Sequence, residues 1–434
     1  MGTRSNKPWI PAFAGMTPIA YVQKDVLLAP LSVIPAKAGI QGCLRKASIL
    51  LFLTFGYPLT LPAVAEDDIT PDTLLSACVE GGDFLLRHQK PDGEFGYRYL
   101  ADKDTYASGY NLLRHAGTCY ALMELYQVTR DERYREAVDR ALASLVESAS
   151  PLRPEHRRPD IEAIVTETTN PDKAKLGGAA LTVLAIIKYQ EATGDEKWLR
   201  RAKNFAGFLL FRQEDNGRFK SRYWYEGDPD DKWESQYYPG EAILALVRLY
   251  EREPDELWLE AAKKGADWLI EVRDAGTAVE DLTHDHWLLI GLHELYLLTG
   301  KDSYLNHSKN IAKAILIKQR MSHPKAEWVG TFYTPPRSAP VATRGEGIVA
   351  VCELAEMVGE PTEVYVRSLE LMAKFLMRCQ ITDKDSARVP NLEAARGGIR
   401  ESLNGWEVRI DYVQHSVSML LGLRRILPRD NARG

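Results

Sequence analysis

Two kinds of helical segment alternate along this chain. Six segments repeat apolar residues on one face and carry Arg, Lys and Glu on the other, and six are rich in small residues and apolar nearly all round. A helix that is apolar on every face must be buried, whereas an amphipathic helix covers a core. The amphipathic segments are residues 72–88, 132–147, 196–211, 255–272, 303–318 and 362–379, and the buried ones are 112–126, 176–192, 239–250, 286–298, 345–358 and 412–423.

Short turns join each buried segment to the amphipathic segment that follows it. In Thr193-Gly-Asp-Glu196 and Thr299-Gly-Lys-Asp302, Gly ends one helix and Asp starts the next. A hairpin of this kind cannot bury its own apolar face, so it must stack on its neighbours. Six hairpins predict an all-α fold, an (α/α)6 barrel, in which the long connections meet above the N-termini of the buried helices.

The first 43 residues look unlike the rest of the chain. Residues 9–17 and 33–41 share the pattern Ile-Pro-Ala-x-Ala-Gly, which resembles the translated product of short palindromic DNA repeats. We therefore expect residues 1–43 to be a spurious N-terminal extension, with translation starting near Leu44.

Residues 44–65 have the features of a signal peptide. Arg45 and Lys46 form a positive region, residues 49–55 are apolar, and Ala63-Val-Ala65 fits a cleavage site. This pattern predicts export to the periplasm or the medium after cleavage near Ala65. The remaining residues, 66–434, are predicted to form one toroid domain.

Charge and cysteine usage exclude several classes of protein. Residues 66–434 carry a formal net charge of −10, whereas the whole chain carries −5. That balance lacks the basic footprint of a nucleic-acid binder, and no apolar run is long enough to span a membrane. Cys78, Cys119, Cys352 and Cys379 are too few for a disulfide scaffold, and the helix order keeps them apart, so we predict four buried free thiols.

A repeated turn points to a family. Gln89-Lys-Pro-Asp-Gly-Glu-Phe95 and Gln213-Glu-Asp-Asn-Gly-Arg-Phe219 resemble the Gln-x-x-Asp-Gly-x-aromatic turn of several α/α-toroid families. Over residues 70–427 the chain resembles the α/α-toroid superfamily, chiefly six-hairpin glycosidases with the related polysaccharide lyases and sugar epimerases. It also resembles terpenoid-cyclase and prenyltransferase toroids. The resemblance implies a carbohydrate-active enzyme.

The cyclase and prenyltransferase readings have little support in the residues. Asp228-Pro-Asp-Asp231 fits the Asp-x-Asp-Asp motif of protonating cyclases, but it lies in a loop of a chain with room for one toroid only. Cys119 follows His115 by four residues, yet no second Cys-His group lies on a neighbouring buried helix. We therefore predict no metal and no cofactor.

Polar residues gather near the N-terminal ends of five buried helices. A charge buried alone is costly, so these groups must be paired, hydrated or facing a ligand. Because the five clusters share one end of the barrel, we expect a binding cleft there. The predicted substrate-binding residues are Tyr97, Arg114, His115, Trp224, Tyr237, Arg344 and Arg409.

Four carboxylates in these clusters suit glycoside hydrolysis, which needs a general acid and a second carboxylate as base or nucleophile. Asp285 and Asp411 start helices, where the helix dipole favours the ionised form that a base needs. Glu241 and Glu346 lie deeper, where desolvation raises a carboxyl pKa and suits an acid. The first prediction is an exported glycoside hydrolase.

Two alternatives remain open. His286 and His415, together with the arginines, would suit a sugar epimerase or a polysaccharide lyase acting on uronic acids, with Arg neutralising a carboxylate or an enolate. A non-catalytic polysaccharide-binding or assembly protein is the third reading, which the number of acid-base groups disfavours. Each reading takes an oligo- or polysaccharide as partner. The substrate, the stereochemistry and the oligomeric state do not follow from the sequence.

Overall fold

The computed structural model describes residues 68–158, 161, 164–167, 170–227 and 232–428. The chain divides into two units, Met1–Ala63 and Val64–Gly434, and every described residue belongs to the second. The predicted extension, the predicted signal peptide and the motif at residues 228–231 therefore lie outside the described residues.

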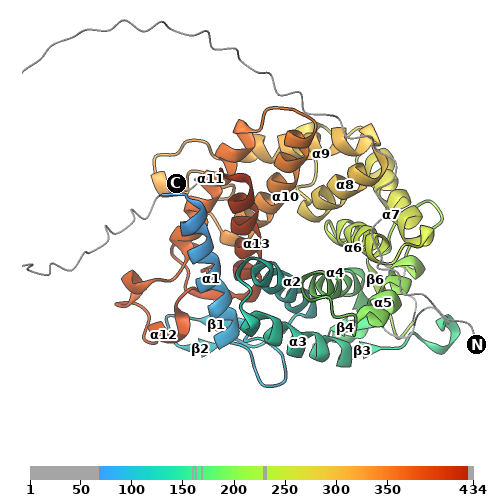
Figure 1. Ribbon diagram of the computed structural model, residues 1–434, viewed down its shortest axis with the longest axis horizontal. Coiled ribbons are helices and arrows are strands. Elements are labelled where there is room, and N and C mark those ends of the chain that lie inside the picture. The colour runs from blue at the N-terminus through green and yellow to red at the C-terminus, as the bar shows by residue number, and fades with distance from the viewer. Residues whose placement is uncertain (1–67, 159–160, 162–163, 168–169, 228–231, 429–434) are drawn as a thin grey trace, which may run out of the picture. The chain divides into compact units, whose positions relative to one another are not determined.

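Six helices form a closed inner ring (Figure 1). Each inner helix packs against the next, and α13 packs against α2. Buried residues occur on nearly every face of these helices, as their apolar composition predicts. The inner helices are α2 (Leu112–Thr129), α4 (Leu176–Thr193), α6 (Tyr238–Arg252), α8 (His286–Thr299), α10 (Ser338–Met357) and α13 (Ile410–Ile426).

Six amphipathic helices surround the ring, each packed on the inner helix before it, with α1 packed on α13. They are α1 (Pro71–Arg87), α3 (Glu132–Glu147), α5 (Leu199–Phe211), α7 (Glu256–Trp268), α9 (Asp302–Lys318) and α11 (Glu363–Cys379). The predicted (α/α)6 barrel is thus confirmed. The four predicted free cysteines are buried and unpaired, also as predicted.

Glutamines just beyond four outer helices tie the outer layer together. Each side-chain amide donates a hydrogen bond to a backbone carbonyl of the next outer helix around the ring. The bonds run from Gln89 to Ala137 (2.8 Å), Gln213 to Ala261 (2.8 Å), Gln319 to Ser368 (3.2 Å) and Gln380 to Ala77 (2.8 Å). The glutamine of the two repeated turns therefore has counterparts in Gln319 and Gln380, where the glycine and the aromatic residue of the motif are absent.

Helix α10 begins seven residues before the predicted start at residue 345. Pro340 is its third residue, where the missing N–H costs no helical hydrogen bond. Gly345 is an interior residue, and a Cβ on it would lie 2.4 Å from Met419 Cγ of α13. Arg344 and Glu346 therefore lie inside the helix, a correction to their predicted place at its start.

Short strands, which were not predicted from the sequence, brace the long connections. One antiparallel sheet has the order β2-β1-β7, with β1 (Arg98–Leu100), β2 (Thr105–Tyr106) and β7 (Glu407–Arg409). The other has the order β3-β4-β5-β6, with β3 (Ala149–Ser150), β4 (Ile164–Glu167), β5 (Asn170–Lys175) and β6 (Arg222–Trp224). Because β1 pairs with β7, the first and last connections meet beside the start of α13.

Short helical turns complete the described part of the chain. They are η1 (Pro154–His156), η2 (Leu269–Arg273), η3 (Val279–Asp281), η4 (Ala326–Trp328), η5 (Asp383–Asp385) and α12 (Leu392–Ala395). Among the described residues, no helix is both long enough and apolar enough to cross a membrane.

Candidate active site

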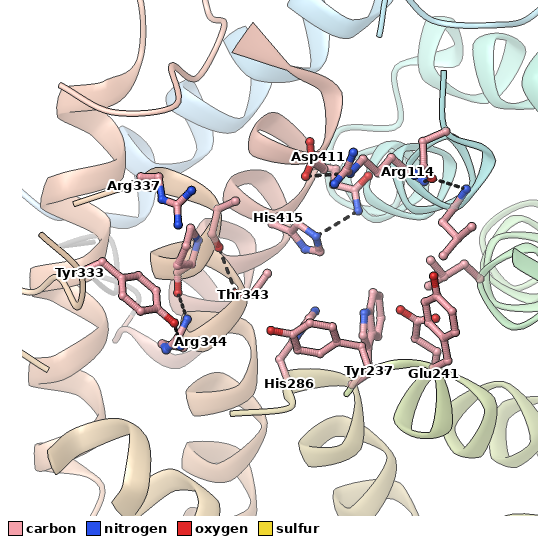
Figure 2. Close-up of a pocket in the computed structure, with 18 residues that line it drawn as sticks. Arg114, Tyr237, Glu241, His286, Tyr333, Arg337, Thr343, Arg344, Asp411 and His415 are labelled. Atoms are coloured by element: carbon pink, nitrogen blue, oxygen red, sulfur yellow. Dashed lines mark hydrogen bonds and ion pairs between the residues drawn. The ribbon is translucent and has the colours of Figure 1, made fainter. Parts of the chain in front are cut away.

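A cavity of about 440 Å³ opens where the inner helices begin, and we call it the central cavity. All six inner helices contribute to its lining. In Figure 2, His286, Tyr237 and Glu241 lie along one side, Arg114, Asp411 and His415 along another, and residues of the connection before α10 along a third. Seven predicted site residues line it: Arg114, Tyr237, Glu241, His286, Arg344, Asp411 and His415.

Two histidines face each other in this cavity, with ring centroids 5.3 Å apart and ring planes at 83°. His286 is 3% exposed, and neither of its ring nitrogens has a hydrogen-bond partner. Burial, with smaller effects from His415 and Arg344, lowers the pKa of His286 well below its ordinary value. His286 is therefore a neutral imidazole with a free lone pair, which is the form a general base needs.

His415 has the opposite character because Glu346 lies beside it. Its Nδ1 lies 2.9 Å from Glu346 Oε2. Burial disfavours the imidazolium, but the Glu346 carboxylate outweighs this effect and raises the pKa of His415 above its ordinary value. Burial raises the pKa of Glu346 to about 6, against the opposing effect of His415. This contact orients His415 so that its Nε2 lies on the side of the ring away from Glu346, where Gln414 Nε2 lies 3.5 Å from it.

Glu346 lies behind the central cavity and lines a separate cavity of about 600 Å³. Its Oε2 also lies 3.4 Å from His286 Nε2. The predicted catalytic carboxylate is therefore placed to act on the two histidines, not directly on a ligand in the central cavity.

His286, Glu346 and His415 also form a potential metal site. Their ligating atoms all lie within 4.8 Å of one another. Two imidazoles and one carboxylate are a donor set that Zn²⁺ and other transition metals accept. No metal was predicted from the sequence, since the three residues come from α8, α10 and α13 and have no short spacing.

Asp411 is held by two arginines. Arg409 binds both of its oxygens, with Nε at 2.5 Å and Nη2 at 2.9 Å, and Arg114 Nε lies 3.1 Å from Oδ2. The guanidinium of Arg114 also donates to the hydroxyl of Tyr97. Tyr97 and Arg409 do not line the central cavity but fix Asp411 and Arg114, which do.

Glu241 and Asp285 form a buried acidic pair. Burial, with the added charge of Asp285, raises the pKa of Glu241 well above its ordinary value. Burial raises the pKa of Asp285 to about 7, although Arg273 and two backbone N–H groups oppose this. The helix start was expected to favour the ionised form of Asp285; the two backbone N–H groups do lower its pKa, but burial has the larger, opposite effect. Asp285 also lies behind Glu241 and does not line the cavity.

Arg344 forms a third wall with residues that were not predicted from the sequence. Its Nη2 donates to the Tyr333 hydroxyl at 2.7 Å, and its Nε lies 2.9 Å from His284 Nδ1. Tyr333 and Arg337 line the cavity from the connection before α10. Their only sequence signal was their position in a long connection, at the end of the barrel where the cleft was expected.

Two predicted binding residues lie elsewhere. His115 is fully buried, with Nδ1 2.5 Å from the Tyr110 hydroxyl and Nε2 3.0 Å from the Ala141 carbonyl oxygen. Nε2 thus ties α2 to α3, Nδ1 ties α2 to the connection before it, and His115 does not line the cavity. Trp224 lies on β6 and lines another cavity.

Comparison with known proteins shows similarity in fold. No protein-family model matches the chain, and no curated protein matches it in sequence. An inactive variant of the GH76A alpha-1,6-mannanase of Salegentibacter sp. HEL1_6, in complex with alpha-1,6-mannotriose, is 14% identical, with a TM-score of 0.57 over 82% of this chain and 100% of that one. The cellobiose 2-epimerase from Spirochaeta thermophila DSM 6192 is 16% identical, with a TM-score of 0.58 over 82% and 97%.

An unsaturated glucuronyl hydrolase specific for heparin is 13% identical, with a TM-score of 0.58 over 82% of this chain and 98% of that one. These are six-hairpin glycosidase-like toroids, so the predicted resemblance is confirmed for the fold.

Proposed function

We propose that the protein is a carbohydrate-active enzyme that moves a proton on a sugar carbon next to a carbonyl or carboxylate group, as an epimerase or isomerase does. The observation that carries this proposal is the His286–His415 pair, whose pKa values move in opposite directions within one cavity. An acid and a base with separated pKa values are what proton transfer requires.

Each histidine has a distinct role in this reaction. The neutral ring of His286 accepts the proton from the carbon, and the electron pair moves onto the adjacent carbonyl oxygen. His415 Nε2 donates a proton to that oxygen or to the opposite face of the carbon, while Glu346 supports the imidazolium through Nδ1. After the proton has been delivered to the opposite face of the carbon, the two histidines have exchanged protonation states, and proton exchange with water restores both groups.

The positively charged residues of the central cavity suit the negative charge that develops on the carbonyl oxygen during proton transfer. Arg114, Arg337 and Arg344 line the central cavity. An enediolate is stabilised by fixed positive charges that are already in place, because little reorganisation is then needed during the reaction. The same arginines would pair with the carboxylate of a uronic acid.

Deuterium exchange tests the proposal. Aldoses, ketoses and uronates are incubated with the purified protein in D2O, and NMR follows deuterium entering the carbon next to the carbonyl or carboxylate. We expect exchange, with His286→Asn and His415→Asn slowing it by about 100-fold or more. His323→Asn makes the same change outside the cavity and should have no effect. Exchange that survives in both cavity variants would contradict the acid and base roles of the two histidines.

Glycoside hydrolysis is the second candidate, and Glu241 favours it. This carboxyl lines the cavity, its Oε2 has no partner, and its raised pKa suits a general acid. Asp411 is the other carboxylate in the lining, but it is held by two arginines. New reducing ends from oligosaccharides, lost in Glu241→Gln and without deuterium at the carbon, would establish hydrolysis instead.

We also propose that the protein is exported. The support is the order of Arg45, Lys46, the apolar residues 49–55 and the small residues up to Ala65. Expression in a Gram-negative host, followed by N-terminal sequencing of the periplasmic fraction, is expected to give a chain that begins at Glu66. A cytosolic chain with residues 44–65 intact would contradict export.

A further inference from the structure

Two carboxyl groups belong to the described lining of the central cavity, and their surroundings differ. Asp411 forms ion pairs with Arg114 and Arg409, which hold it as a carboxylate. Glu241 is 4% exposed, and its Oε2 has no hydrogen-bond partner among the described residues. Of the two groups, Glu241 is therefore the one that is free to give a proton to a ligand.

The packing around Glu241 favours its neutral form. Its Oε2 lies against Gly177 of α4, where a Cβ would be only 2.2 Å from this oxygen. An ionised oxygen without a donor is costly in such a place, whereas the carbonyl oxygen of a neutral carboxyl group costs much less. Burial and the neighbouring Asp285 raise the pKa of Glu241 accordingly. Because Oε2 is enclosed in this way, Oε1 is the oxygen that can reach a ligand.

Glu241 lies on the same side of the central cavity as the proposed base. Figure 2 shows Glu241, Tyr237 and His286 along this side, and the ring centres of Tyr237 and His286 are 5.8 Å apart. The Glu241 N–H donates to the Tyr237 carbonyl oxygen at 2.9 Å, so one turn of helix separates these two residues. In a cyclic aldose, the ring oxygen and the carbon that loses its proton are both bonded to the anomeric carbon. One bound sugar can therefore meet His286 at that carbon and Glu241 at the ring oxygen.

We infer that Glu241 opens and closes the ring of the bound sugar, so that the protein also interconverts the α and β anomers of a reducing sugar. This inference rests on the proposed function for its ligand, and it narrows the substrate to a reducing sugar, whose carbonyl group appears only when the ring opens. Glu241 donates its proton to the ring oxygen, and the bond between that oxygen and the anomeric carbon breaks. The anomeric hydroxyl loses its proton to water as the C=O bond forms, and the water returns a proton to Glu241. The reverse steps close the ring on either face of the carbonyl.

Mutarotation of monosaccharides tests this inference. The probes are freshly dissolved α-D-glucose, α-D-mannose, α-D-galactose and α-D-galacturonate, and polarimetry in dilute buffer follows their approach to anomeric equilibrium. We expect the protein to speed this approach for at least one sugar, with a rate that saturates as the sugar concentration rises. Glu241→Gln should lower the acceleration by about tenfold or more. Glu251→Gln makes the same substitution on α6 outside the central cavity and should keep the parent rate.

A second variant separates an acid from a structural role. Glu241→Asp keeps an acid at this position and should retain more acceleration than Glu241→Gln, while circular dichroism checks that both variants are folded. No acceleration by the parent protein with any of the four sugars, or equal acceleration by the parent and Glu241→Gln, would overturn the inference.

The same samples separate ring opening from the proposed function. The four sugars contain no glycosidic bond, so hydrolysis contributes nothing to the signal. In D2O, NMR follows deuterium entering the carbon next to the carbonyl. Faster mutarotation without deuterium at that carbon would overturn the proposed proton transfer and leave ring opening in place. Deuterium entry without faster mutarotation would overturn ring opening alone.

Discussion

Asp285 offers a test of the buried electrostatics of the site. Its side chain is fully buried, and its Oδ1 accepts a hydrogen bond from the Leu288 N–H at 3.1 Å as the N-cap of α8. Burial raises its folded-state pKa to about 7. Asn keeps the acceptor oxygen of the cap but cannot ionise, so Asp285→Asn removes the titration and preserves the helix start.

The sign and size of the effect follow from the pKa shift. A carboxyl group whose folded pKa is raised contributes stability that is present below its unfolded pKa of about 3.9 and is lost as the pH rises through the folded value of about 7. Between pH 5 and pH 8 this group alone costs the parent protein roughly 2 to 3 kcal/mol of unfolding free energy. The stability of Asp285→Asn relative to the parent should therefore rise by that amount over the same interval.

Urea denaturation of parent and variant at pH 5, 6, 7 and 8 measures this difference directly. Asp255→Asn makes the same substitution at the exposed N-cap of α7, where Asp255 Oδ1 accepts from the Leu257 N–H at 3.0 Å. It measures the effect of the substitution itself at an exposed cap. If the Asp285→Asn difference stays constant with pH, Asp285 is not a neutral carboxyl in the folded protein, and the reasoning fails.

Three further outcomes are expected. Glu346→Gln removes the anion beside His415, so the pKa of His415 should fall and the basic limb of the pH-rate profile should move to lower pH. An unchanged profile would show that Glu346 does not set the pKa of the catalytic acid. Zn²⁺ should inhibit reversibly by binding His286, Glu346 and His415, with recovery after EDTA and weaker zinc binding in Glu346→Ala measured by calorimetry; activation by zinc would contradict a metal-free reaction. Reduction should leave the intact mass of the unfolded protein unchanged because Cys78, Cys119, Cys352 and Cys379 are unpaired.

The helices could be predicted closely because periodicity and turn residues report local structure. The predicted segments 132–147 and 286–298 fall within one residue of α3 and α8 at each end. The direction of single side chains could not be predicted in this way. Arg114 and His115 are neighbours on α2, yet the first faces the central cavity and the second bonds to Ala141 of α3. Successive residues point about 100° apart on a helix, so helix position alone did not separate a ligand-facing group from a packing group.

The pairing of strands that are far apart in the sequence also could not be predicted from local sequence patterns. The strands β1 and β7 are three residues each, lie near opposite ends of the domain's sequence, and pair with Tyr99 opposite Val408. That pairing places Arg98 beside Glu407 and positions Arg409 at the start of α13, where it binds Asp411. Strands of three residues are too short to show the alternation of apolar and polar residues that identifies a strand. Their partners come together only when the ring of helices closes.

The position of Glu346 depends on the two glycines that flank it. A Cβ on Gly345 would lie 2.4 Å from Met419 Cγ of α13, and a Cβ on Gly347 would lie 2.6 Å from Leu289 Cδ1 and 3.3 Å from His286 Cα of α8. The missing side chains therefore let α10 approach α13 on one side and α8 on the other. Because His415 is on α13 and His286 is on α8, the same approach brings Glu346 within 2.9 Å and 3.4 Å of the two imidazoles. Two glycines within a helix lower its intrinsic stability. In α10 they allow the close packing that places the Glu346 carboxylate between His415 on α13 and His286 on α8.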